Sequence, residues 1–399
     1  MNFVICTYNF PPQNDAEAYC TARFASALAR AGHHVHVVTM AHPPAISQAI
    51  YRELVDQSVE VTCVTMKKEK FLPLLYYQFK YLTFYKNAHN LVDLINAMRL
   101  VLLKYDAPIL VSRYSPEASA IVAWHCRDLT KQWVAHFSDP FPLFYGKWLY
   151  GKVRVEVQKI WGRRVLKGAD KITLTCENAR RYFENMYGAE YGPKIFVTKH
   201  IGYPVLSSVG YGITRKDYDF VITHTGTLMV ARHFEYIIQE LNSFCLTHKN
   251  ICFMQFGPVC DKVKEVLKQP LPFKFCINSI EDPRWCSDIF AQSDVNLVAD
   301  LKINNELDYS PFLPSKFVYA IYFNRPIICV TCEDSEMAKL ASGYGEGILF
   351  ADVAKSGDLN KQLCLVYEDR RKTCPLSLKD VYTERRVAEK FISDISCDG

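Results

Sequence analysis

Several short motifs that mark common enzyme classes are missing from this chain. No GxGxxG follows the first strand-like run, and GxxxxGK[ST] occurs nowhere. Neither a nicotinamide site of the usual kind nor a P-loop is therefore indicated. GxSxG and HExxH are also absent, which removes two further catalytic signatures. Any function must come from less regular signals.

The chain also has no long apolar run and little net charge. No apolar stretch approaches the ~20 residues of a membrane span, and the first strand-like run begins at Asn2, which leaves no room for a signal peptide. The 47 Lys and Arg slightly outnumber the 42 Asp and Glu, which fits anionic ligands or an anionic membrane surface. The 15 cysteines are scattered, with one CxxC at Cys329 and Cys332. We expect reduced thiols in a cytoplasmic protein, peripheral at the inner face of the membrane.

What the 399 residues do contain is two series of alternating strand-like and helix-like segments. Strands are predicted over residues 2–6, 35–38, 59–64, 109–112, 133–137 and 171–175, and then over 220–222, 251–256, 274–277, 295–298, 326–330 and 348–350. Strands alternating with helices imply parallel sheets covered on both faces. We predict an α/β protein with two Rossmann-like doubly wound domains facing across a cleft.

The domain boundaries follow from where each series opens and closes. We place an N-terminal domain over residues 1–205 and a C-terminal domain over 206–382. Residues 383–399 form a terminal helix that can pack back on the N-terminal domain. The glycine- and serine-bearing stretch 207–212 suits a linker.

Two stretches of the second series could bind an anion. Pro314, Ser315 and Lys316 open a helix that Ser315 can cap, which leaves backbone N–H groups free for a diphosphate beside the charge of Lys316. In residues 223–232, Gly226 ends a strand and Arg232 can reach a phosphate as a fork of donors. The structural alternatives are a capped helix with a solvated lysine and a surface arginine.

In the first series, a proline-bearing loop and a later strand end carry the candidates. Asn14 and Asp15 lie at a predicted helix start, with Asp15 as the N-cap. His136 and Asp139 lie at the end of a later strand, and both ends should face the same crevice. A buried histidine and a capping aspartate are the alternatives.

Residues 66–86 combine five lysines and one glutamate with seven aromatic residues. Such a mixture suits an element lying on anionic lipid, at about 1 kcal/mol per cation near the surface. An amphipathic helix packed on its own domain is the alternative. No nucleic-acid partner is expected, because no RNP or OB signature accompanies these residues. The residues predicted to face the membrane, here and in the similar stretch 144–167, are Lys67, Lys68, Lys70, Phe71, Trp148 and Lys152.

An ordered set of segments resembles a known family. In chain order these are PP before an acidic helix start, LARAGHHVHVVT, FSDP, ADKITLTCENARRYF, KIFVTKHIGYP, THTGTL, QFGP, SDVNLV and LPSKFVYAIYFNRPIICV. Over nearly the whole chain this order is similar to the two-domain GT-B glycosyltransferases, family 4 in particular. The resemblance implies transfer of a hexose-like sugar from a nucleotide-sugar donor to a glycan or lipid-linked acceptor in cell-surface polysaccharide assembly. It also implies retention of configuration, with no metal or other cofactor.

The resemblance assigns roles to the candidates. Arg232 and Lys316 would neutralise the leaving diphosphate, and the loop at Asn14 and Asp15 would close over the sugar. His136 and Asp139 would take part in catalysis. The remaining donor-binding residues would be Gly226 and Thr227 beside the phosphates, Pro314 and Ser315 through backbone amides, and Asn278 to Ile280 near the nucleobase.

The chain departs from the family pattern in four places, one of which is Ser138-Asp139, where many members have His-Asp at the end of an N-terminal strand. Asn14-Asp15 stands where paired glycines are usual, and Gly226-Thr227 stands where Gly-Arg is usual. The two glutamates of E-x7-E are replaced by Pro311 and Tyr319, which leaves Glu306 and Asp308 as candidates for the ribose-binding acid. The alternatives are a catalytically impaired GT-B scaffold protein in a membrane-associated glycan assembly complex and a GT-B sugar-nucleotide epimerase.

Overall fold

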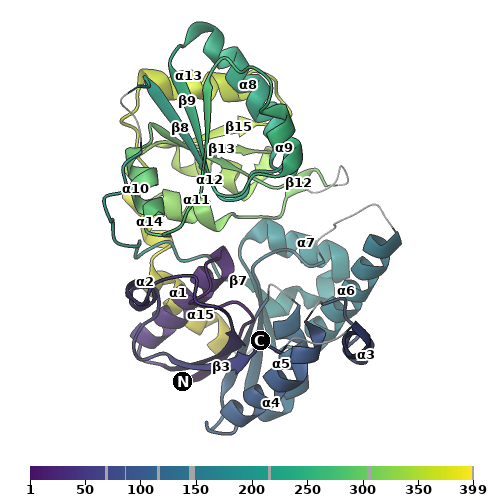
Figure 1. Ribbon diagram of the computed structural model, residues 1–399. Helices are drawn as coiled ribbons and strands as arrows, with labels where there is room; N and C mark the ends of the chain where they lie inside the picture. The colour runs from purple at the N-terminus through teal and green to yellow at the C-terminus, as the bar shows by residue number, and fades with distance from the viewer. Residues whose placement is uncertain are drawn as a thin grey trace. The chain divides into compact units, whose positions relative to one another are not determined.

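The computed structural model describes residues 1–67, 71–85, 87–114, 117–142, 149–213, 217–302 and 307–397, except for the side chains of 71–73, 114, 149 and 150. The chain divides into two compact units (Figure 1). Unit 1 is Met1–His200 together with Glu384–Gly399, and unit 2 is Ile201–Thr383. The chain therefore passes between the units twice, and unit 2 is an insertion within unit 1.

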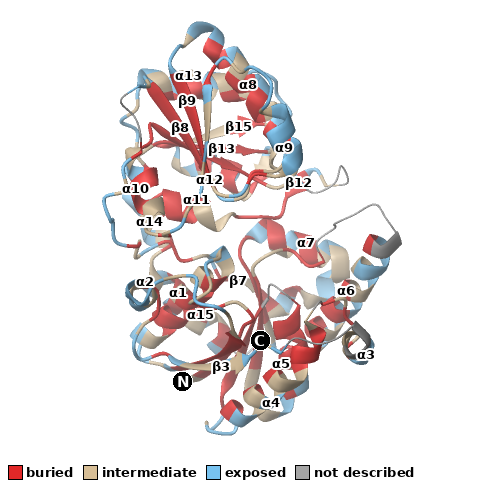
Figure 2. Ribbon diagram, in the orientation of Figure 1, coloured by how far each residue is buried: buried red, intermediate tan, exposed pale blue. Residues whose placement is uncertain are grey.

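Unit 1 is built on a seven-stranded parallel sheet of order β3-β2-β1-β4-β5-β6-β7. Its strands are β1 (Asn2–Cys6), β2 (His34–Ala41), β3 (Glu60–Thr65), β4 (Ile109–Tyr114), β5 (Gln132–Phe137), β6 (Lys171–Leu174) and β7 (Ile195–Val197). Its helices are α1 (Ala16–Arg30), α2 (Gln48–Leu54), α3 (Phe71–Lys80), α4 (Leu91–Leu102), α5 (Ala118–Cys126), α6 (Leu149–Gly168), α7 (Glu177–Tyr187) and α15 (Glu384–Ser396). The central strands are buried on both faces (Figure 2), as expected for a parallel sheet covered by helices.

Helix α1 begins and ends where its sequence signals predict. The Asp15 carboxylate accepts a hydrogen bond of 2.7 Å from the N–H of Ala18, so the predicted N-cap is confirmed. The helix closes at Ala31, and Gly32 follows with a φ of +86°, the left-handed conformation that favours glycine. The start of α1 is thereby fixed beside the end of β1.

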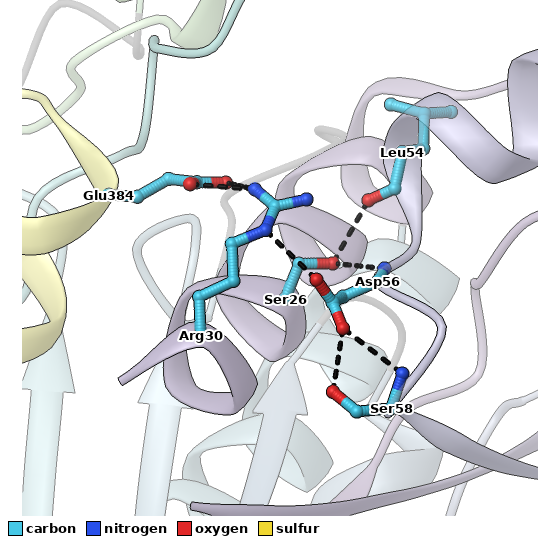
Figure 3. Close-up of polar contacts among 6 residues, drawn as sticks. All are labelled: Ser26, Arg30, Leu54, Asp56, Ser58 and Glu384. Carbon is cyan, nitrogen blue, oxygen red and sulfur yellow. Dashed lines mark hydrogen bonds and ion pairs between the residues drawn. The ribbon is translucent and has the colours of Figure 1, made fainter. Parts of the chain in front are cut away.

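Helix α15 completes the core of unit 1 although it follows unit 2 in the chain. Phe391 is fully buried, and its ring lies 4.9 Å edge-on from that of Phe24 on α1. Arg30 donates from Nη1 to both carboxylate oxygens of Glu384, at 2.5 and 2.7 Å, and from Nε to Asp56 at 3.0 Å (Figure 3). Beside this pair, Ser26 Oγ donates to the carbonyl of Leu54 and accepts from the N–H of Asp56.

Unit 2 has a six-stranded parallel sheet of order β10-β9-β8-β11-β13-β15. The strands are β8 (Phe220–Thr225), β9 (Ile251–Phe256), β10 (Lys274–Asn278), β11 (Val295–Ala299), β13 (Ile327–Thr331) and β15 (Ile348–Asp352), and β12 (Tyr309–Ser310) pairs separately with β14 (Asp334–Ser335). The helices are α8 (Phe234–Thr247), α9 (Asp261–Val266), α10 (Trp285–Gln292), α11 (Ser315–Ala320), α12 (Glu336–Tyr344), α13 (Asp358–Glu368) and α14 (Leu376–Val381). Helices α8, α9 and α13 pack on one face, and α10 contributes to a smaller cluster on the other.

The stretch 207–212 belongs to unit 2. The Asp288 carboxylate accepts hydrogen bonds from Ser208 Oγ and from the N–H groups of Val209 and Tyr211. The Tyr211 ring also stacks on Trp285, with centroids 4.4 Å apart. This stretch is thus bound to α10, and the chain enters unit 2 earlier, at Ile201. The predicted fold class, two parallel α/β sheets flanked by helices, is confirmed.

Candidate active site

In unit 2 the strand order reverses between β8 and β11, which run side by side although β9 and β10 lie between them in sequence. Doubly wound sheets bind ligands outside the carboxyl ends of their strands at such a point. Gly226 directly follows β8 with a φ of +91°, and Arg232 ends the short 3-10 helix Val230–Arg232. Asp300 directly follows β11. The reversal of strand order therefore brings the predicted site residues Gly226 and Arg232 to the edge of the sheet that is formed by the carboxyl ends of its strands.

Lys316 lies at this edge and is partly buried. Its Nζ donates to the carbonyl of Thr225 at 3.1 Å and lies 2.8 Å from His224 Nε2. A Cβ atom added to Gly226 would be 4.0 Å from the same Nζ. Burial, reinforced by repulsion from Arg232, holds the pKa of Lys316 well below its usual range. The structure thus brings Lys316, Gly226 and Arg232 together.

Arg232 and Asp300 complete the charged groups around Lys316. Arg232 donates from Nη1 to the carbonyl of Ala299 at 2.8 Å. The buried Asp300 carboxylate accepts from the N–H of Leu301 at 2.7 Å, from Thr331 Oγ1 at 3.1 Å and from Ser310 Oγ. Burial raises the pKa of Asp300, while these hydrogen bonds and Arg232 act to lower it. Two cations and one well-bonded carboxylate therefore share this edge.

The start of α11 differs from the prediction. Pro314 is the N-cap residue, with extended backbone, and no side chain caps the helix. The predicted cap at Ser315 is wrong, because Ser315 is already the first helical residue, and a capping oxygen must project from the extended residue before it. Helix α11 is only six residues long, so the charge of Lys316 is the main feature that this segment brings to the site.

The other predicted donor-binding residues lie at two places in unit 2. Thr227 follows Gly226 directly, and Asn278 ends β10, where its carbonyl accepts from the N–H of Gly257 at 2.9 Å. Gly257 in turn packs so closely that an added Cβ would be 2.8 Å from the carbonyl oxygen of Gly226. Ile280 packs against the small apolar cluster that includes Phe256, as does Trp285.

In unit 1 the strand order reverses between β1 and β4, and the loop after β1 carries Asn14 and Asp15. Asn14 Oδ1 accepts from the Tyr19 hydroxyl at 2.5 Å, and Asp15 caps α1.

His136 lies in β5 with 2% of its surface exposed, and its ring stacks on Phe24, with ring centroids 6.4 Å apart. Within the described chain neither of its ring nitrogens has a hydrogen-bond partner, and burial lowers its pKa. Asp139 is partly buried just beyond the strand.

Glu17, which was not among the predicted site residues, lies at the same reversal point in unit 1. Its Oε1 accepts from Ser138 Oγ at 2.9 Å and lies 3.6 Å from Arg113 Nη2 on β4. Burial raises the pKa of Glu17 to about 7, although Arg113 and Ser138 act to lower it. Helical spacing could have revealed this position, because Glu17, Thr21 and Phe24 lie on one face of α1.

The residues predicted to face a membrane are only partly described. The Lys67 side chain is 61% exposed and pairs with Asp93 at 2.7 Å, and Lys152 is exposed on α6. Phe71 begins α3, but its side chain is outside the described residues, as are Lys68, Lys70 and Trp148. No helix in the described ranges is both long and apolar enough to cross a membrane. Those ranges also hold no group of three His, Cys, Asp or Glu side chains arranged to bind a metal ion.

Comparison with known proteins gives matches at the level of family and of fold. Residues 17–195 match the family described as glycosyl transferase 4-like domain. No curated protein matches the chain. Among solved structures, it is similar to sucrose-phosphate synthase from Thermosynechococcus elongatus, with 13% identity, a TM-score of 0.70 and 98% of each chain covered. It is also similar to TarM, with 11% identity, a TM-score of 0.67 and coverage of 100% of this chain and 99% of TarM. A third similar structure is Anabaena HepE in complex with UDP and glucose, with 14% identity, a TM-score of 0.62 and 99% of each chain covered.

Residues 17–195 of unit 1 are therefore similar to a glycosyl transferase 4-like domain, and the whole chain has the fold of the GT-B glycosyltransferases. The predicted resemblance to this group is confirmed. The family match and the fold together support a transferase enzyme.

Proposed function

We propose that this protein transfers a sugar from a nucleotide-sugar donor and that unit 2 binds the donor's diphosphate at Lys316 and Arg232. The observation that carries the proposal is the partly buried Lys316 Nζ beside Gly226, at the reversal point of the sheet. Within the described chain Lys316 has no carboxylate within ion-pair distance. A cation that is partly withdrawn from water and lies near a second cation, as Lys316 does near Arg232, is stabilised by a bound anion.

The same two cations account for catalysis in this proposal. As the bond between the sugar and the diphosphate breaks, negative charge develops on the leaving phosphate oxygen. The Lys316 ammonium and the Arg232 guanidinium stabilise this charge from fixed positions, where such stabilisation is strongest. They would take the place of a metal ion, and the sugar would be transferred with retention of configuration. The roles of His136 and Asp139 in that step stay predictions.

Single substitutions test the donor site. Lys316→Ala and Arg232→Ala should each reduce the release of nucleoside diphosphate from a sugar nucleotide by about 10²- to 10³-fold, the usual effect of removing one such electrostatic donor. The matched controls are Lys262→Ala and Arg371→Ala, which remove exposed cations of unit 2. Unchanged turnover in both site variants would refute the assignment.

The donor itself can be narrowed with a thermal-shift panel of UDP-, GDP-, dTDP- and CMP-sugars, since a ligand that binds only the native state raises its melting temperature. Anabaena HepE contains UDP and glucose, and a further similar structure from E. coli contains UDP-2-fluoro glucose, so UDP-sugars are the first to test. No shift with any of them would favour the scaffold protein over the enzyme.

We further propose that the acceptor is lipid-linked and is reached at an anionic membrane, in the assembly of cell-surface polysaccharide. Support comes from α3, where Phe79 and Tyr76 are 87% and 60% exposed next to the exposed Lys80. Phe79→Ser with Tyr76→Ser should reduce co-sedimentation with vesicles containing phosphatidylglycerol. Leu246→Ser, at an exposed apolar residue of α8, is the control. If the unmodified protein, the double variant of α3 and Leu246→Ser all sediment equally with the vesicles, this surface of α3 does not bind the membrane.

A further inference from the structure

Behind Lys316 lies a chain of buried hydrogen bonds that neither the fold nor the family match assigns to a function. It runs from Lys316 Nζ to His224 Nε2 at 2.8 Å, and from His224 Nδ1 to Gln255 Oε1 at 2.7 Å. His224 and Gln255 are register partners on the neighbouring strands β8 and β9, and both are fully buried. These contacts determine which atom donates at each step.

The orientation of the Gln255 amide is fixed first. Its Nε2 lies 2.7 Å from the carbonyl oxygen of Gly226 and 3.3 Å from that of Gly257. Carbonyl oxygens only accept, so the amide NH₂ must point toward these two glycines. Gln255 Oε1 is therefore the atom that faces His224, and it can only accept from the imidazole.

The histidine tautomer follows from that orientation. His224 Nδ1 must carry the proton that Gln255 Oε1 accepts, and burial together with the nearby charges of Lys316 and Arg232 keeps the pKa of His224 well below its usual range. The imidazole is therefore neutral, and its Nε2 presents a lone pair to Lys316. Gln255 thus makes His224 an acceptor for the lysine.

These two acceptors leave Lys316 with one available donor. In the ammonium form, which a bound anion stabilises, Lys316 has three N–H groups, and His224 Nε2 and the Thr225 carbonyl accept two of them. The described chain offers the third no hydrogen-bond partner, and Gly226, which has no side chain, lies beside it. Withdrawing a lysine partly from water without a carboxylate in ion-pair distance costs stability, which a purely structural network would not offset.

We propose that His224 and Gln255 are positioning residues that hold the Lys316 ammonium so that its third N–H is directed to an oxygen of the donor's diphosphate. The inference rests on the proposed function, because it assumes that Lys316 binds that diphosphate. It adds that the affinity for the diphosphate depends on His224 and that this dependence acts only through Lys316.

A double-mutant cycle tests the dependence. The affinities for UDP and, as a probe without a base, inorganic pyrophosphate are measured by calorimetry on the full chain. His224→Leu removes the acceptor and should weaken binding of both probes about tenfold, whereas His224→Gln, whose amide oxygen can take the place of Nε2, should retain most of it. In the Lys316→Ala background, His224→Leu should cause no further loss. A general structural effect of residue 224 would persist in that background.

Two further variants complete the experiment. His248→Leu changes the histidine that follows the last residue of α8 and should leave both affinities unchanged. If His224→Leu does not fold, His224→Met replaces it in the cycle. Its flexible thioether side chain is at most a weak acceptor, so the same loss and the same non-additivity are expected.

The possible results separate the inference from the proposed function. If the unmodified protein binds neither UDP nor pyrophosphate, both are overturned. If Lys316→Ala weakens binding but the change at His224 has no effect, or has an additive effect, the donor site stands and the positioning role is refuted. The positioning role is established if the losses of affinity caused by His224→Leu and Lys316→Ala are non-additive and if His224→Gln retains most of the affinity.

Discussion

The replacement of Glu17 by Gln provides a direct test of the buried carboxyl group in unit 1. Burial raises the pKa of this group from 4.5 to about 7. Its proton is therefore bound more tightly in the folded state than in the unfolded state. The stability that this group contributes is fully present below about pH 4.5 and is lost as the pH rises through 7.

The size of the effect follows from the same pKa shift. One pKa unit corresponds to about 1.4 kcal/mol, so the shift of Glu17 corresponds to at most about 3 kcal/mol at pH 8. The side chain is 14% exposed, so water reduces this value somewhat. Gln resembles the protonated carboxyl group and can still accept from Ser138 Oγ. Glu17→Gln should therefore stabilise unit 1 at pH 8 and have little effect at pH 4.5.

Urea unfolding followed by tryptophan fluorescence provides the measurement, because Trp133 and Trp161 are buried in unit 1. Glu177→Gln, at an exposed glutamate in the first turn of α7, is the control. It should change the free energy of unfolding by the same amount at both pH values. If Glu17→Gln is equally stable or less stable than the unmodified protein at pH 8, the carboxyl group is not destabilised by its burial and the reasoning fails.

Three other perturbations have defined outcomes. Phe391→Ala should lower the free energy of unfolding of unit 1 by about 3–5 kcal/mol in urea titrations, because it opens a cavity against Phe24, and an unchanged midpoint would show that α15 is not part of this core. Ser26→Ala should cost about 1–3 kcal/mol in the same assay, since the Leu54 carbonyl and the Asp56 N–H lose their buried partner (Figure 3). Binding of UDP should take up protons at pH 8, because an anion beside Lys316 raises its lowered pKa. Calorimetry in Tris and in HEPES should then give different heats, and equal heats would contradict this expectation.

The strands could be predicted well from the sequence because buried parallel strands are short, nearly continuous apolar runs. The strand predicted over residues 251–256 matches β9, and the strand predicted over 220–222 is β8, which continues to Thr225 just before Gly226. The three-residue strand β7 was missed, because Ile195–Val197 is too short to show a pattern. The stretch 207–212 was taken for a linker because its composition does not reveal the bonds to Asp288.

Some residues of the candidate site could likewise be predicted from the sequence, and others could not. Arg232 and Lys316 could be proposed from local charge and from the order of the segments, and the structure brings them together. His224 and Gln255 could not be found, because their contact depends on the register of β8 against β9. A single sequence does not specify that register. Glu17 was missed for a similar reason, since its partners Arg113 and Ser138 are about a hundred residues away in the chain.

The position of α15 bears on the order in which the protein can fold during synthesis. The ribosome makes every residue of unit 2 before it makes Glu384, so unit 2 can reach its native state while unit 1 still lacks its last helix. Until α15 emerges, the apolar surface around Phe3, Phe24 and Phe196 has no Phe391 to cover it. The nascent first half is then open to aggregation or to a chaperone, and it can close only when synthesis reaches the final helix.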